Sequence, residues 1–71
     1  RAAFLDSAQR HLDLLKRARC DGNWVVAAMR IKGLAASFHA RDLMDAAETA
    51  LASAPGEPMA IREIEETIAR F

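Results

Sequence analysis

The sequence has little of several features that define common protein classes. It holds one cysteine, Cys20, which excludes an internal disulfide and a four-cysteine zinc site. Ten basic and ten acidic side chains give zero formal net charge, which excludes a nucleic-acid binder that relies on an excess of positive charge. No apolar run approaches the roughly 20 residues that span a bilayer, and no signal peptide opens the chain. We therefore expect a reducing, cytoplasmic location, with no direct membrane contact and no nucleic acid as partner.

What the sequence does contain is alanine. Sixteen of the 71 residues are Ala, against three Gly and two Pro, and this composition favours helices. The hydrophobic share of 52% is too high for a disordered tail. A chain of this length forms one small domain, so we expect residues 1–71 to be a single helical unit. Because the chain begins at Arg1 without Met, we also expect it to be a piece of a longer protein.

Helix-breaking residues divide the chain into four segments. The clear breaks are residues 21–23 and 55–58, and a weaker break lies near residues 37–41. Gly22 is expected to end the first helix, and Asn23 is expected to cap the second with its side-chain oxygen. The predicted helices cover residues 3–20, 23–38, 40–54 and a last segment that starts at Glu57 or Pro58.

Each segment carries one apolar stripe at helical spacing, which predicts a common core. Four short helices with short connections bury four such stripes most simply as an antiparallel four-helix bundle, so the predicted fold class is all-α. The stripe residues are Leu5, Ala8, Leu12 and Leu15; Ala27, Ile31, Leu34, Ala35 and Phe38; Leu43, Ala46, Ala47, Ala50, Leu51 and Ala54; and Ile61, Ile64, Ile68 and Phe71.

The second segment has a further face, formed by Val25, Met29, Lys32, Gly33 and Ala36. Gly33 lies in the middle of a run of good helix formers, where Gly costs roughly 1 kcal/mol relative to Ala. A close approach by another helix or by an external partner is the usual compensation for that cost. The result is a face of small residues with one cation, and Met29 is either part of a partner-binding surface or a core methionine.

The run from Met29 to Phe38 resembles the histidine-phosphotransfer (HPt) domains of bacterial phosphorelays. The family signature is a His, two residues, then Lys-Gly, followed by small residues and an apolar residue. The resemblance covers nearly the whole chain, and only this central motif is specific. The matching residues are Ile31, Lys32, Gly33, Leu34, Ala35, Ala36 and Phe38, then Leu43 to Leu51 with Glu48, and upstream Leu12, Leu15, Asp21 and Trp24.

The resemblance implies a signalling domain of a two-component phosphorelay whose partner is a response-regulator receiver domain. In such a domain the residue at the Lys32 position supplies positive charge near the phosphoryl group, and the one at the Gly33 position leaves space for the receiver. The family's phosphorylated His falls at Met29, whose thioether cannot form a phosphoramidate. His39 also departs from the family, which often has Gly there. The resemblance therefore implies a domain that binds a receiver through Val25, Met29, Lys32, Gly33 and Ala36 without carrying phosphate.

Two alternatives remain open at this point. The chain is a structural or dimerising helical domain in which exposed Val25 and Met29 form a homodimer interface, or it is an active phosphotransferase whose native His was changed to Met. In either case no cofactor is expected, and no nucleophile–base pair indicates an independent enzyme. The resemblance also implies a possible parent protein, a membrane-bound sensor kinase, because HPt domains often form the last domain of such kinases.

The remaining polar residues give weaker signals. His39 as a displaced phosphate acceptor is disfavoured, because it lies ~10 Å along the helix axis from Lys32. Asp42, Asp45 and Glu48 are expected to form a solvated face rather than a metal site, since no His joins them. His11 has no neighbouring Lys-Gly pair that would make it an acceptor.

Overall fold

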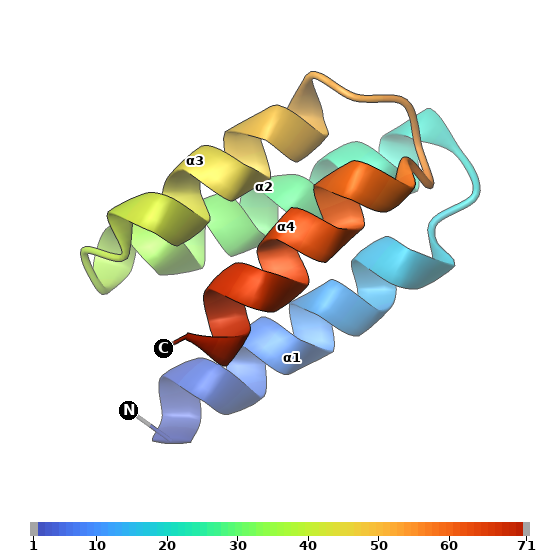
Figure 1. Cartoon of the computed structure of the whole chain (residues 1–71). Coiled ribbons are helices and arrows are strands. Elements are labelled where there is room, and N and C mark those ends of the chain that lie inside the picture. Colours follow the sequence, from blue (N-terminus) through green and yellow to red (C-terminus); the bar gives the residue numbers. More distant parts are fainter. Residues whose placement is uncertain (1, 71) are drawn as a thin grey trace.

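The computed structural model describes residues 2–70, and of Ala2 only the backbone. It contains four helices: α1 (Ala2–Arg17), α2 (Asp21–Ser37), α3 (Arg41–Leu51) and α4 (Pro58–Ala69). Within residues 2–70, α1 packs against α2 and α4, and α3 packs against the same two helices. The helices therefore surround one core, and the seam between α1 and α2 lies opposite the seam between α3 and α4 (Figure 1). The all-α four-helix bundle expected from the sequence is confirmed.

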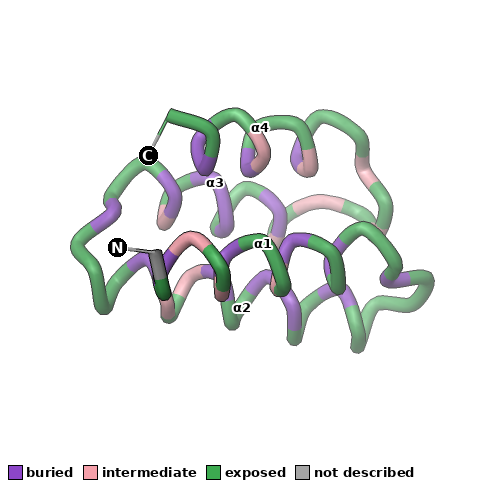
Figure 2. Tube along the Cα trace, turned by 90° about the horizontal axis from the view of Figure 1, so that it is seen from below, coloured by how far each residue is buried: buried purple, intermediate pink, exposed green. Residues whose placement is uncertain are grey.

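The core is built mainly from alanine. Figure 2 shows that the buried positions of all four helices face one another. Small side chains at these positions let helix backbones approach closely. The buried apolar residues are Phe4, Ala8, Leu12, Leu15, Ala18, Trp24, Ala27, Ala28, Ile31, Ala35, Ala40, Leu43, Ala46, Ala47, Ala50, Ala60, Ile64 and Ile68.

Trp24 links the start of α2 to the end of α3 through a hydrogen bond. Its side chain is 1% exposed, and its indole Nε1 donates a hydrogen bond of 2.8 Å to the carbonyl oxygen of Ala50. A buried indole N–H needs such an acceptor, because an unpaired polar group in the core costs free energy. This contact fixes the position of the α2 N-terminus, from which the face named above extends.

The predicted boundary between the first two helices is wrong by several residues. α1 ends at Arg17 rather than near Cys20, and α2 already begins at Asp21. Gly22 therefore lies inside α2 and does not end α1. Cys20 takes the N-cap position with an extended backbone (φ −129°, ψ 160°) and makes no side-chain cap bond, so Asn23 is not the cap. Asp21 lies in the first turn of α2, where its negative charge interacts favourably with the positive end of the helix dipole.

The predicted stripes are also corrected at their ends. Phe38 is 47% exposed and lies against the buried Phe4 of α1, with ring centroids 4.8 Å apart. Ala54 is exposed, because α3 ends at Leu51 and the chain leaves the core there. Phe71 lies outside the described residues. Four other stripe residues are only half-buried: Leu5, Leu34, Leu51 and Ile61.

The α2–α3 turn is a Schellman motif in which a histidine occupies the usual glycine position. The Ala40 N–H donates to the carbonyl of Ala35 (2.8 Å) and the His39 N–H donates to that of Ala36 (3.2 Å). His39 has φ of 56°, in the left-handed region. These bonds satisfy the last carbonyls of α2 and set its end at Ser37.

α4 begins as the sequence predicts. The Glu57 carboxylate accepts a hydrogen bond of 3.0 Å from the Met59 N–H, and Pro58 occupies the first helical position, where a missing N–H costs nothing. This cap ties the α3–α4 loop to the first turn of α4.

Candidate docking surface on α2

The five residues singled out from the sequence lie together on the outer side of α2, and we call them the α2 face: Val25, Met29, Lys32, Gly33 and Ala36. Four of them are exposed and Lys32 is half-buried. Met29 is 53% exposed, so the interpretation of Met29 as a core residue is wrong. α2 is therefore apolar on two sides: one side enters the core, and the other carries Val25 and Met29 in contact with solvent.

Gly33 has no packing partner within residues 2–70 that would explain its lack of a side chain. A Cβ placed on Gly33 would meet no neighbouring heavy atom within 4 Å. Of the two compensations expected for a mid-helix Gly, close approach by another helix of this domain is excluded. Of the two, only the approach of an external partner is left as a hypothesis.

Lys32 borders the α2 face on the side of α3. Its Nζ lies 3.1 Å from Oε2 of Glu48, and both side chains remain partly solvated. An ion pair of this kind contributes at most about 1 kcal/mol, so it holds the ammonium loosely. The sequence indicated Glu48 only as part of the next helix and did not indicate this pairing. The α2 face thus presents one cation that an approaching anion can recruit.

The α2 face combines apolar side chains with a single cation. Lys32 is its only ionisable group, and none of its members is a nucleophile that could carry a phosphoryl group at neutral pH. His39 is exposed in the turn after α2 and lines a shallow hollow of about 170 Å³ with Ala36, Arg41 and Met44. His39 follows the end of α2 at Ser37, which lies eight residues, or about 12 Å along the helix axis, beyond Met29. His39 therefore does not replace the missing acceptor at Met29.

A groove between α1 and α2, which the sequence reasoning missed, adjoins the α2 face. Its volume is about 370 Å³, and Leu14 and Val26 line it while each staying about half exposed. Leu14 is an apolar residue outside the stripe predicted for the first helix. An apolar side chain away from the core-facing stripe is the sequence signal for this groove. The lining residues are Leu14, Arg17, Ala18, Asn23, Val26, Ala27 and Arg30.

His11 lies in the same seam and has an unusual environment. Its Nδ1 is buried without a hydrogen-bond partner in the described chain. Burial lowers the pKa of His11 below its ordinary value of 6.5, and the positive charges of Arg30 and Arg10 lower it further. The imidazole is therefore mainly neutral at pH 7.

Other kinds of site find no support in the described part of the chain. Within residues 2–70, no group of three or more His, Cys, Asp and Glu side chains is arranged to hold a metal ion. No helix among these residues has the length and apolar character required to cross a bilayer. Comparison of the chain with protein-family models, with curated proteins and with solved structures gave no match.

Proposed function

We propose that this chain is an HPt-like signalling domain of a cytoplasmic phosphorelay that binds a response-regulator receiver domain through the α2 face and does not carry phosphate. The observation that carries the proposal is Gly33, which is exposed, lies mid-helix and has no neighbour within 4 Å of its Cβ position. A residue that costs about 1 kcal/mol and serves no internal contact is accounted for by an external one.

The surroundings of Gly33 support the same proposal. Met29 and Val25 provide exposed apolar area, and Met adapts its shape to a partner because its side chain is unbranched and flexible. Ala36, one turn after Gly33 on the same face, has a small side chain and keeps the surface shallow there. Lys32 adds a positive charge that its surface pair with Glu48 neutralises only in part. Together these residues form a shallow apolar patch with one cation, which suits a partner whose contact surface is apolar and partly acidic.

Phosphotransfer is absent from the proposal because of the side chain at position 29. The thioether of Met29 has no proton to lose and is not a phosphoryl acceptor at neutral pH. A receiver that binds the α2 face therefore keeps its phosphoryl group, because this chain cannot accept it. A non-transferring domain of this kind would act by sequestering a receiver from other partners.

An NMR titration tests the docking. Receiver domains from the same parent protein or pathway are added to ¹⁵N-labelled chain, and amide shifts are expected to centre on Val25, Met29, Gly33 and Ala36. Met29→Glu is expected to weaken binding by at least about tenfold, which corresponds to about 1.4 kcal/mol. Met59→Glu is the matched control, since Met59 is an equally apolar and even more exposed side chain on α4. Shifts that centre on α3 and α4, or equal effects of the two variants, would refute the proposal.

The Met29→His variant tests whether this fold can support phosphotransfer. The variant is expected to accept a phosphoryl group from a phosphorylated receiver in a radiolabel transfer assay, while Met59→His is expected to accept none. Failure of Met29→His to accept phosphate, together with no binding of any receiver, would favour the structural alternative.

The second candidate function is a homodimer formed through Val25 and Met29. The exposure of both apolar side chains on one helix face favours it. Light scattering separates the two functions: a dimer that Met29→Glu dissociates supports this candidate, and a monomer that binds a receiver supports the first.

A further inference from the structure

The groove between α1 and α2 is lined by apolar and basic side chains. Leu14, Val26 and two alanines provide the apolar surface, and Arg17 and Arg30 are its only charged lining residues. Neither arginine forms an ion pair with any residue in the range 2–70. A bound group that matches this groove must therefore bring an apolar side chain flanked by negative charge.

The opposite side of the bundle offers that combination. Met59, at 70% exposure, is the most exposed large apolar side chain among residues 2–70. It borders a hollow of about 490 Å³ that Glu57, Glu63 and Glu66 also line. Arg62 is the only basic residue of that hollow, and its Nε already pairs with Glu66 at 3.3 Å.

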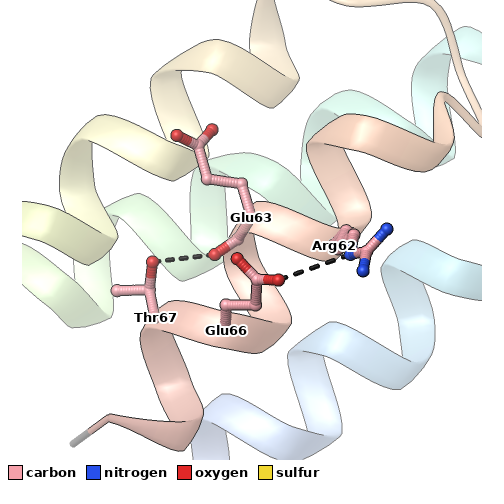
Figure 3. A network of polar contacts seen from close by, with 4 residues as sticks. All are labelled: Arg62, Glu63, Glu66 and Thr67. Carbon is pink, nitrogen blue, oxygen red and sulfur yellow. Dashed lines mark hydrogen bonds and ion pairs between the residues drawn. The ribbon is translucent and has the colours of Figure 1, made fainter.

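Figure 3 shows that the carboxylates of Glu63 and Glu66 on α4 point in different directions. Arg62 and Glu66 point toward each other, whereas the Glu63 carboxylate projects away from Arg62 toward α3. The Thr67 hydroxyl donates a hydrogen bond of 2.7 Å to the backbone carbonyl of Glu63, so it does not engage that carboxylate. Glu63 has no ion pair within the described residues, and Asp42 and Asp45 of α3 border the adjoining hollow.

The formal charges of the two halves of the described chain have opposite signs. Residues 2–40, which form α1 and α2, hold six basic and three acidic side chains, a net charge of +3. Residues 41–70, which form α3 and α4, hold three basic and seven acidic side chains, a net charge of −4. Because the α1–α2 seam lies opposite the α3–α4 seam, the molecule is an electrical dipole across its short axis (Figure 1).

We infer that two copies of this chain associate head to tail, with Met59 of one copy in the α1–α2 groove of the other and the carboxylates around Met59 facing Arg17 and Arg30. The occupant is a second copy because the chain's own opposite side supplies both parts of the complement, the apolar side chain and the negative charge. Such a contact joins two different surfaces, so in a pair the copy that gives its Met59 keeps a free groove and the copy that gives its groove keeps a free Met59.

The expected association is weak and salt-dependent. Exposed charges are screened over about 10 Å at 0.1 M ionic strength, so added salt removes the electrostatic part. In sedimentation velocity at low salt, the weight-average mass is expected to rise above 7.8 kDa as the concentration approaches about 1 mM. Raising the ionic strength is expected to return it toward the monomer value.

A mixing experiment tests the head-to-tail geometry. Val26→Asp removes the groove and leaves Met59, whereas Met59→Asp removes the apolar side chain and leaves the groove. Each variant alone is expected to stay monomeric, and an equimolar mixture is expected to form a one-to-one pair through the one intact contact. Circular dichroism checks that both variants remain helical, which their exposed positions favour.

Met29→Asp is the matched control, because it changes the α2 face and leaves both contact surfaces intact, and it is expected to associate like the parent chain. Association that Met29→Asp abolishes and Met59→Asp does not would overturn the inference in favour of a symmetric dimer. A constant monomer mass at low salt, or two variants that fail to pair on mixing, would also overturn it. None of these results depends on whether a receiver binds the α2 face.

Discussion

Replacement of Gly33 by Ala separates the stability of the fold from its proposed use. The added methyl group would meet no heavy atom within 4 Å, so the substitution introduces no clash. Gly in a helix interior is about 0.8–1.0 kcal/mol less favourable than Ala. Gly33→Ala is therefore expected to raise the free energy of unfolding by about 0.8 kcal/mol. For a domain of this length that corresponds to a rise in Tm of about 4–6 °C.

The assay is thermal and urea unfolding followed by circular dichroism at 222 nm, with the parent chain measured alongside. Gly56→Ala is the matched control, since Gly56 has φ of 82° and its conformation disfavours any Cβ. That variant is expected to lose about 1–2 kcal/mol. The two Gly-to-Ala changes should thus shift stability in opposite directions. A loss of stability in Gly33→Ala would refute the reasoning, because it would mean that Gly33 serves the fold.

The same variant bears on function. If the space above Gly33 admits a partner, its methyl group is expected to weaken receiver binding while the fold becomes more stable. Binding unchanged by Gly33→Ala would remove the main support for the α2 face as the docking surface.

Three further predictions concern the fold. Trp24→Phe is expected to lower the free energy of unfolding by about 2 kcal/mol, because it removes the hydrogen bond to Ala50 and leaves a cavity; a urea midpoint equal to the parent's would contradict this. His39→Gly is expected to stabilise the chain by about 1 kcal/mol, since Gly adopts the left-handed φ of 56° without strain, and a calorimetric Tm below that of the parent would argue otherwise. Burial and the neighbouring arginines hold the pKa of His11 in the folded chain below 6.5. Below pH 6.5 the unfolded chain therefore binds more protons than the folded one. The free energy of unfolding is expected to fall as the pH drops toward the lowered pKa. In His11→Gln this part of the pH dependence should be smaller, which urea unfolding at pH 7.5 and at lower pH can measure.

The number, order and class of the helices could be predicted from the sequence, because each helix carries a stripe of period 3.6. Only the break between α3 and α4 contains Gly and Pro. The boundaries could not be predicted. Gly22 is a typical helix terminator, yet α2 begins before it at Asp21, and Trp24 in the same first turns is buried in the core. Phe38 fits the stripe of α2, but the helix ends there, and its ring covers Phe4 at the surface instead of entering the core.

The candidate site shows the same division. Periodicity places Val25, Met29, Lys32, Gly33 and Ala36 on one face of a helix, and that face is the exposed one. The α1–α2 groove and the pairing of Lys32 with Glu48 were beyond prediction, because each depends on how two helices are rotated against one another. A single sequence specifies the face of a helix more readily than the partner of that face.

The alanine content of the interior determines which changes the domain can tolerate. Ten of the eighteen buried apolar side chains are methyl groups, and at these ten positions the side chain can hardly be shortened further. Enlarging them is the serious threat: a Val at Ala28 or Ala47, both with no exposed area, would push two helices apart at a cost of about 1–3 kcal/mol. At these alanine positions the bundle is vulnerable to added bulk, and engineering for greater stability should begin on its outer surface.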